Sequence, residues 1–449
     1  MTDSDNGHTR RRYVQLAAGA GIAGLAGCSG GGGGDSGGSG NGSTSETTTS
    51  SSGGGASATL EVQHWWTGGD GGDAIQSLFD GFKEKYPEVE VEQNPVSGGA
   101  GQNLKSVIKK RILNNNPPSS WQAWPGKNLL PYTEADKLVD IEESVWSHND
   151  MKNAYMDGPM NAAKPDGNLV TVPLNIHRLN NLFYNPQVLS DAGVSIDDIS
   201  TPSDLVDAMA TVESETEAHG MVQATSGPWT TLQLWETVFL GEHGLDTYNT
   251  FIDGNGGDVE TEAKDALSIV KQYREHWNDD SDSLSWTQAN NEFISGNAAF
   301  FHNGDWAAGM YYGAEDFEYG THWDHVAFPG TDGLYTLVMD SFPFPANNPS
   351  PEATKKFLRY VGSVDAQQRF NPKKGSIPPR TDVPKEPFNP FSQDQMDDFS
   401  NSDSQPPSIA HGLATSPETL TNLENATATF TSNWDVDATF SAYVSAFGN

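Results

Sequence analysis

Residues 64–72 read HWWTGGDGG and directly follow a short run, residues 59–63, that alternates like a β-strand. Two adjacent tryptophans cannot point to the same face of a sheet, because successive side chains of a strand alternate between its two faces. One tryptophan can pack inside the protein while the other stays open beside the glycines and Asp70. The pattern therefore raises the question of what an exposed tryptophan recognises at the end of a strand.

Predicted helices and strands alternate along the chain that follows the double tryptophan. Apolar residues at helical spacing predict a helix over residues 73–86, which Asp73 opens and Pro87 closes. An alternating run at 88–93 predicts a second strand, and a second helix is expected at about 101–113. This order is typical of a parallel sheet with helices on its faces, and such sheets bind ligands at the carboxyl ends of their strands. The double tryptophan lies at such an end.

The rest of the chain continues the mixture of strands and helices, without an internal repeat of fixed period. Further strands are predicted at residues 169–174, 182–184 and 298–301, and further helices from 202, at 232–240, 265–277, 353–361 and 365–370, and from 415 onward. We therefore expect an α/β protein.

The composition limits the size and the partners of the protein. The 449 residues suffice for two or more domains of ordinary size. Asp and Glu total 60 against 25 Lys and Arg, which gives a formal net charge of −35. So acidic a surface excludes nucleic acid and anionic lipid surfaces as electrostatic partners. It suits a protein of concentrated salt, where charge repulsion is screened, and an ordinary acidic protein is the alternative.

The N-terminal residues predict export and a lipid anchor. Three arginines at 10–12 precede an uncharged run at 16–27, and the single cysteine, Cys28, ends the sequence LAGC. Residues 1–28 therefore resemble a twin-arginine lipoprotein signal, in which cleavage exposes Cys28 for lipid attachment at the extracellular face of the membrane. The alternative is a short buried helix with an incidental cysteine. Residues 29–57 are almost entirely Gly, Ser and Thr, so we expect a flexible tether.

Seven motifs are spread in order over most of residues 60–380. They are HWWTGG at 64–69, WQAWPG at 121–126, TVPLNIHR at 171–178, TPSDL at 201–205, FFHNGDW at 300–306, PGTDG at 329–333 and KKGSIP at 373–378. Together they resemble the extracellular solute-binding protein family 1 of ABC transporters. Within that family they look most similar to the glucose and mannose binders.

The resemblance implies a type II periplasmic-binding-protein-like fold of two α/β lobes. A hinge of crossing strands would join the lobes, which would close on ligand. The first lobe would hold residues 58–173 and return near 318–345. The second would hold 174–317 and 346–449. The interleaving of the lobes follows from the family alone.

A neutral hexose presents hydroxyls and patches of aliphatic C–H. The hydroxyls call for planar polar side chains that bond two neighbours at once, and the C–H patches call for an aromatic face. An open tryptophan at residue 65 or 66 meets the second need, and the Asp70 carboxylate can meet the first. By the resemblance, the aspartate of the GDW turn, Asp305, lies at the sugar. The full set of predicted ligand contacts is Trp65, Trp66, Asp70, Gln122, Trp124, His177, Arg178, Trp229, Trp235, Asn303, Asp305 and Lys374.

Several of these residues also have an ordinary structural interpretation. The tryptophans can fill the core, Asp305 can cap a helix, Arg178 can pair with a carboxylate, and Lys374 can be solvated. Many relatives place a histidine where Trp124 stands, and this departure weakens what the resemblance implies about the detailed sugar preference.

Other chemistry finds little support. Residues 253–258 imitate part of a calcium loop, but the pattern fails at the fifth position, and His322 and His325 lack a third metal ligand at useful spacing. Phosphate-loop and nucleophile motifs do not occur. We expect no cofactor, no metal and no catalytic residue.

The sequence therefore predicts a monomeric sugar-binding component of an ABC importer. It would capture a monosaccharide, glucose or mannose, and deliver it to membrane permease subunits served by a cytoplasmic ATPase. The alternatives are a secreted glycoside hydrolase, which needs two carboxyls about 5–10 Å apart, and a static lectin without domain closure.

Overall fold

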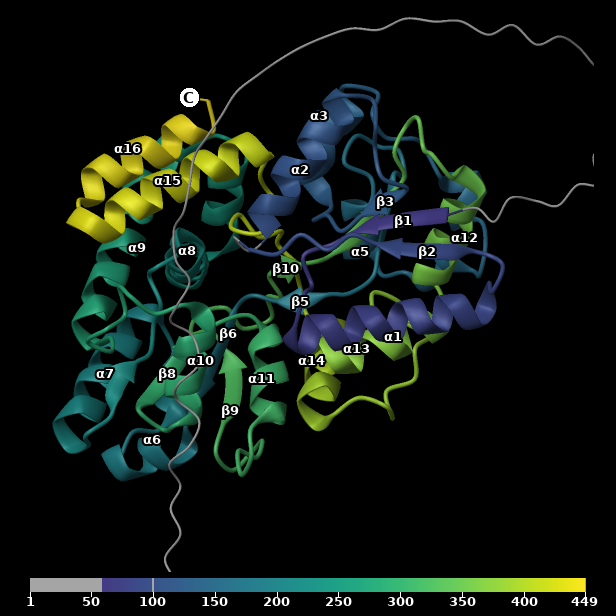
Figure 1. The fold of residues 1–449 in the computed structure, drawn as a ribbon. Helices are drawn as coiled ribbons and strands as arrows, with labels where there is room; N and C mark the ends of the chain where they lie inside the picture. The colour runs from purple at the N-terminus through teal and green to yellow at the C-terminus, as the bar shows by residue number, and fades with distance from the viewer. Residues whose placement is uncertain (1–58, 99–100, 449) are drawn as a thin grey trace, which may run out of the picture. The chain divides into compact units, whose positions relative to one another are not determined.

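The computed structural model describes residues 59–98 and 101–448, except for the side chain of Asp70. The described residues all belong to one compact unit (Figure 1). The predicted signal, tether and lipid attachment at Cys28 lie outside the described residues. Among the helices of the described chain, none has the length and apolar character needed to cross a membrane.

A parallel three-stranded sheet forms the centre of the first lobe. Its strands β1 (Thr59–Gln63), β2 (Glu90–Gln93) and β3 (Ser120–Trp121) lie in the order β2-β1-β3. Helices α1 (Gly69–Lys85) and α2 (Gln102–Leu113) follow β1 and β2, as the alternating pattern predicted. The two tryptophans follow β1 after one intervening residue, at the carboxyl end of this strand.

A mixed four-stranded sheet forms the centre of the second lobe. Its order is β7-β8-β6-β9, with β7 parallel to β8 and the other neighbours antiparallel. The strands are β6 (Asn181–Tyr184), β7 (His219–Met221), β8 (Ala298–His302) and β9 (Asp324–Ala327), and the helices around them are α6 (Pro186–Ala192), α7 (Pro202–Glu215), α8 (Pro228–Ile252), α9 (Glu260–Tyr273), α10 (Trp286–Ile294), α11 (Ala308–Gly313), α15 (Pro417–Asn433) and α16 (Val436–Ala446).

Two antiparallel strand pairs cross between the lobes. Strand β4 (Thr171–Pro173) pairs with β11 (Ser341–Pro343), and β5 (His177–Arg178) pairs with β10 (Leu337–Val338). Both pairs join residues more than 150 positions apart, so the chain passes between the lobes in both directions. The two-lobe α/β class expected from the resemblance is confirmed by the structural relatives described below.

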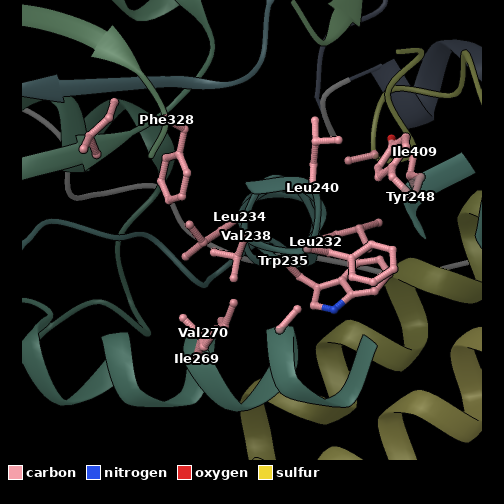
Figure 2. Close-up of a cluster of buried hydrophobic side chains, with 14 of the residues drawn as sticks. Leu232, Leu234, Trp235, Val238, Leu240, Tyr248, Ile269, Val270, Phe328 and Ile409 are labelled. Carbon is pink, nitrogen blue, oxygen red and sulfur yellow. The ribbon is translucent and has the colours of Figure 1, made fainter. Parts of the chain in front are cut away.

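The core of the second lobe surrounds helix α8. Every residue of α8 from Thr230 to Leu240 is buried, so the first half of the helix has no polar face toward water. Figure 2 shows apolar side chains pointing away from α8 in several directions. The ring of Trp235 stacks on that of Phe239, with centroids 5.4 Å apart and planes 7° apart. The surroundings of α8 are therefore core rather than surface.

The described contacts divide the lobes differently from the sequence-based expectation. Strand β9 lies within the range 318–345 that was assigned to the first lobe, but it pairs with β6 in the second sheet. Helices α12 (Pro351–Val361) and α13 (Val364–Lys374) pack in the apolar cluster of the first lobe, with α13 against α1. We propose that β9 belongs to the second lobe and α12 and α13 to the first.

Short elements complete the described chain. They are the short helices α3 (Leu130–Thr133), α4 (Met151–Ala154) and α5 (Asp157–Ala162), the longer helix α14 (Pro390–Asn401), the single turns η2 (Gly126–Leu129), η4 (Ile196–Asp198), η5 (Gly256–Val259), η6 (Arg274–His276) and η7 (Asp305–Ala307), and a π-helical turn η3 (Glu142–Trp146). The stretch that imitates a calcium loop leads through η5 into α9. Within the described residues, no group of three or more His, Cys, Asp or Glu residues is placed to hold a metal ion.

Candidate functional site

A cavity of about 740 Å³ lies where residues of both lobes meet. Its volume falls in the range of small-molecule sites. The first lobe contributes the segments after β1 and before α2, and the second lobe contributes the start of α8, the turn η7 and the segment before α15. The lining side chains used below are Trp65, Trp66, Gln102, Trp124, His177, Trp229, Trp286, Trp306, Asp340, Lys374, His411 and Glu424.

The two adjacent tryptophans differ in burial, as the alternation predicted. Trp66 is only 7% exposed, and its ring packs on Phe370 with centroids 5.0 Å apart. Trp65 is half-buried and lies edge-on to Trp124, with centroids 5.9 Å apart. The backbone N–H of Trp65 donates to Oε1 of Gln122 at 3.0 Å, which fixes the start of this segment. The open tryptophan thus presents its ring to the cavity.

An aromatic wall centred on His411 joins the two lobes. The imidazole of His411 lies 5.3 Å from Trp124, 5.2 Å from Trp306 and 6.2 Å from Trp229, measured between ring centroids. Burial lowers the pKa of His411 to about 3, so its ring is neutral at ordinary pH. Neutral rings and indoles together offer faces that attract C–H groups.

A chain of polar side chains forms the base of the cavity at the crossing strands. The Asp340 carboxylate, between β10 and β11, accepts from Gln122 Nε2 at 2.9 Å and from Asn175 Nδ2 at 3.0 Å. The side-chain oxygen of Asn175 accepts in turn from the backbone N–H of Asp340 at 2.7 Å. All three side chains are buried, so their orientations are fixed by these bonds.

Asp305 does not line the cavity itself and lies behind His177. Nδ1 of His177 is hydrogen-bonded to the Asp305 carboxylate, and Nε2 lies 3.2 Å from Asn175 Nδ2. The arrangement suits a ring whose Nδ1 donates to Asp305 and whose Nε2 accepts from Asn175. Asp305 also accepts from the backbone N–H of Arg178 at 3.1 Å. Burial raises the pKa of the Asp305 carboxyl well above its usual range, and the Arg178 N–H opposes this shift.

Helices α2 and α15 meet at the cavity and bring the lobes into contact. Nε2 of Gln102 donates to both oxygens of Glu424, at 3.1 and 2.9 Å. The Lys105 ammonium lies 3.6 Å from the centroid of the Trp124 ring. Burial lowers the pKa of Lys105 to about 8, while Glu424 opposes this shift. Burial likewise raises the pKa of Glu424. The Gln102 hydrogen bonds and the charge attraction between Lys105 and Glu424 therefore both act across the two lobes.

Residues 65–368 match the family of bacterial extracellular solute-binding proteins. The chain belongs to this family. A xylose/arabinose-binding protein of Haloferax volcanii is 39% identical to it, over 99% of this chain and 98% of the relative. An uncharacterised ABC transporter extracellular-binding protein of Pyrococcus horikoshii is 34% identical over 84% of this chain and 85% of its own. A glucose-binding protein of Saccharolobus solfataricus is 24% identical over 68% of this chain and 57% of its own.

Solved structures share the fold of this solute-binding protein. One, from a study of xylan utilisation by Caldanaerobius polysaccharolyticus, has a TM-score of 0.75 at 17% identity and covers 86% of this chain and 98% of its own. A chitin oligosaccharide binding protein has a TM-score of 0.72 at 16% identity, and the match covers 88% of this chain and 100% of its own. The family consists of binding proteins and not enzymes, so the hydrolase alternative is overturned.

The structure of this solute-binding protein brings half of the predicted contacts to the cavity. Those that line it are Trp65, Trp66, Trp124, His177, Trp229 and Lys374. Gln122 and Asp305 lie directly behind the lining, bonded to Asp340 and His177. The side chain of Asp70 lies outside the described residues.

Three predicted contacts do not line this cavity: Trp235, Asn303 and Arg178. Trp235 is core, with Nε1 donating to the carbonyl of Ala263 at 3.3 Å, because α8 is enclosed on all sides. Asn303 is buried, and its oxygen accepts from the backbone N–H of Gly304 at 3.0 Å. These two sequence-based assignments to the cleft are corrected by the structure.

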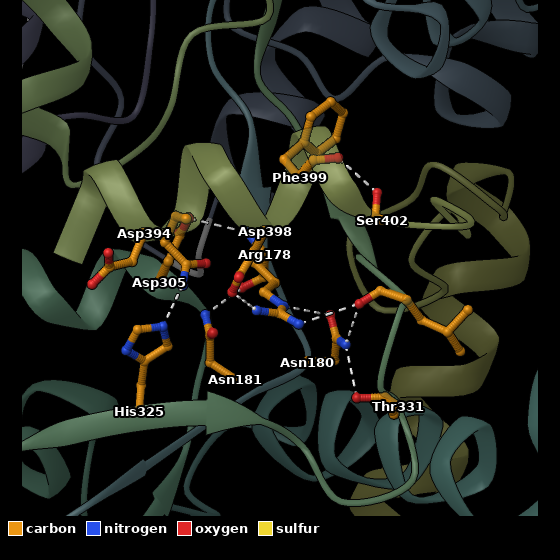
Figure 3. Close-up of polar contacts among 12 residues, drawn as sticks. Arg178, Asn180, Asn181, Asp305, His325, Thr331, Asp394, Asp398, Phe399 and Ser402 are labelled. Atoms are coloured by element: carbon orange, nitrogen blue, oxygen red, sulfur yellow. Dashed lines mark hydrogen bonds and ion pairs between the residues drawn. The ribbon is translucent and has the colours of Figure 1, made fainter. Parts of the chain in front are cut away.

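Arg178 points away from the cavity and into the interior of the protein. Its guanidinium donates to Asp398 at 2.7 Å (Figure 3). It also stands over the Tyr335 ring, 5.2 Å from the centroid. The arginine lines a second cavity of about 550 Å³. The alternative interpretation of Arg178 as an ion-pair residue is the one that the geometry supports.

Several lining residues were not predicted. Asp340, His411, Trp286, Gln102 and Glu424 come to the cavity from segments without a motif. An acid between two β-like runs, as at Asp340, was a usable signal, because the crossing strands place it at the hinge. His411 offered none, since nothing local distinguishes it from a loop histidine.

Proposed function

We propose that the chain is the sugar-binding component of an ABC importer and that it captures a neutral monosaccharide in the cavity between its lobes. The observation that carries the proposal is the pairing of an aromatic wall with a base of buried, hydrogen-bonded polar side chains. The wall suits the C–H faces of a sugar, and the base supplies donors and acceptors of fixed direction. The names of the relatives support a sugar as the solute.

Glucose or mannose is the first candidate, on the motifs at 64–69, 171–178 and 304–306. A pentose such as xylose or arabinose is the second, and the 39% identity to the Haloferax volcanii protein over nearly the whole chain favours it. Many polar contacts in such a cleft lead us to expect a Kd of about micromolar, equivalent to roughly −8 kcal/mol.

Transport requires two conformations that differ by only a few kcal/mol. Ligand contacts made from both lobes stabilise the closed form, and loss of those contacts at the permease releases the sugar. The lobes would hand the sugar to permease subunits driven by a cytoplasmic ATPase, at the extracellular face of the membrane. Anchoring there through a lipid on Cys28 is part of the same proposal.

Calorimetric titration of the full chain in molar salt tests the proposal, with glucose, mannose, galactose, xylose, arabinose and maltose as separate ligands. Tight binding of one monosaccharide, with compaction of the protein in small-angle scattering, would support an import receptor and name its cargo. Binding without compaction would favour a static lectin. Silence of the folded protein across the panel would overturn the assignment to monosaccharides.

A further inference from the structure

Glu236 carries a buried carboxyl group on helix α8, inside the core of the second lobe. The residue is only 1% exposed. Its oxygens accept four hydrogen bonds, from Ser408 Oγ at 2.8 Å, Ile409 N at 2.6 Å, Ala410 N at 3.2 Å and Tyr248 Oη at 3.0 Å. Such a group is costly to bury unless it is fully bonded, so four donors in a core need an explanation.

Three of the four donors belong to one segment of the chain, residues 408–413, which we call the cavity segment. Ala410 and His411 of this segment line the cavity. Ser408 links the carboxylate to His411 directly, because its Oγ donates to Glu236 and accepts from the backbone N–H of His411 at 3.2 Å. Glu236 thus holds the backbone that carries the centre of the aromatic wall.

The cavity segment also contacts the first lobe. The carbonyl of Gly412 accepts from Asn128 N, and that of Leu413 from Lys127 N, each at 3.0 Å. Gly126 has a positive φ of 73°, and a Cβ there would stand 2.7 Å from the Leu413 carbonyl oxygen. The cavity segment and residues 126–128 of the first lobe therefore touch through their backbones. The position of the cavity segment is thus set from both lobes.

We propose that Glu236 is a positioning residue of the binding site, which fixes the cavity segment so that His411 stands against Trp124, Trp229 and Trp306. The inference rests on the proposed function, because it assigns Glu236 to the site that binds the sugar. Glu236 itself does not line the cavity, and it acts through Ser408 and the backbone of residues 409–411.

The hydrogen bonds require two acceptor oxygens at this position. Ile409 N–H approaches one oxygen and Ala410 N–H the other, and a backbone N–H cannot reverse its role. An amide at residue 236 would therefore point its NH₂ group at one of these N–H groups in either orientation. The substitution Glu236→Gln keeps the shape of the side chain and removes one anchor of the segment.

The test compares Glu236→Gln with Thr237→Val, a buried neighbour on the same helix whose hydroxyl bonds Gln233 and His302 and not the cavity segment. We expect Glu236→Gln to weaken sugar binding at least about tenfold in calorimetry and to shift the imidazole NMR resonances of His411 in the ligand-free protein. Thr237→Val is expected to lower the melting temperature without either effect.

A second variant keeps the inference testable if Glu236→Gln does not fold. Ser408→Ala removes the link to His411 and leaves the two backbone bonds to Glu236 in place, so it should shift the same His411 resonances and weaken binding by a smaller factor. Unmoved His411 resonances and unchanged affinity in a folded variant would overturn the inference. If the wild-type protein binds no sugar, the proposed function fails, and the His411 resonances still decide the role of Glu236.

Discussion

At the scale of single residues, the binding site extends beyond the side chains that line the cavity. His177 lines the cavity, and its ring is oriented by Asp305 and Asn175, which lie on different segments. His411 is likewise set by Ser408 and Glu236. In both cases a buried carboxylate stands one side chain away from the cavity. Replacing such a residue changes the direction of a contact rather than removing a contact.

Asp305→Ala is expected to abolish detectable sugar binding, because His177 loses the acceptor that orients it. Circular dichroism should still show a folded protein. The matched control is Asp398→Ala, which removes the half-exposed partner of Arg178 and leaves the cavity untouched. Calorimetry on both variants checks the prediction. Unchanged affinity in the Asp305 variant would remove Asp305 from the site.

The pKa of Glu236 predicts how stability changes with pH. Burial raises it from 4.5 to about 7, so the folded state holds the proton over a range in which the unfolded chain has lost it. The contribution of this group is therefore fully present below pH 4.5 and is lost as the pH rises through 7, by about 3 kcal/mol.

The free energy of unfolding of the wild type, minus that of Glu236→Gln, should therefore be larger at pH 5 than at pH 8. Urea unfolding in constant salt measures both values. The titratable neighbours do not charge within this range, because Tyr248 and Tyr443 have pKa values raised by burial and the pKa of His411 is about 3. A difference that is independent of pH would contradict the shift.

At the scale of elements, the sequence predicted the strand that precedes the double tryptophan. It did not predict which distant segments pack beside that strand to complete the site. The alternation at 59–63 predicted β1, and the double tryptophan after it predicted an open aromatic ring. Asp340 and His411 meet these residues only through the pairing of β10 with β5 and the passage of the chain back past β10. Sequence periodicity carries no information on pairings over such separations.

Helix α8 shows a second limit of sequence reasoning. Trp229 and Trp235 lie six residues apart on one helix, and both were predicted to reach the cleft. Trp229 does, because the first turn of α8 borders the cavity, whereas Trp235 is enclosed by α9 and α16. A helix that is buried all round has no hydrophobic stripe to show which side faces the ligand.

The contact of α2 with α15 predicts an effect on lobe closure. Glu424→Ala removes the acceptor of Gln102 and the counter-charge of Lys105, so it should favour the open form and weaken sugar binding about fivefold, or roughly 1 kcal/mol. Stopped-flow fluorescence should show the change in the dissociation rate. Lys109→Ala, which replaces an exposed lysine of the same helix, serves as the control. Equal dissociation rates for Glu424→Ala and wild type would exclude a role in closure.

At the scale of the whole molecule, the dominant feature is the net charge of −35. Ion pairs such as Arg369 with Glu84 and Lys356 with Glu88 use part of the scarce positive charge, but acids outnumber bases more than two to one. The uncompensated charge repels itself at low ionic strength and is screened at high ionic strength. The fold is therefore expected to depend on salt.

Raising KCl from 0.1 to 2 M should increase the free energy of unfolding by about 2 kcal/mol or more, which corresponds to several degrees in melting temperature. Calorimetric melting at a series of salt concentrations measures the effect. A neutral osmolyte at the same osmolality is the control for effects other than screening. A melting temperature that does not respond to KCl would show that the charge does not limit stability.

The two ends of the described chain belong to different lobes, since β1 lies in the first sheet and α16 packs in the second lobe (Figure 1). Any relative motion of the lobes must change the separation of these ends. A donor and an acceptor fluorophore fused at residue 59 and after residue 446 would convert that change into an energy-transfer signal. The architecture thus lends itself to a genetically encoded indicator of its solute.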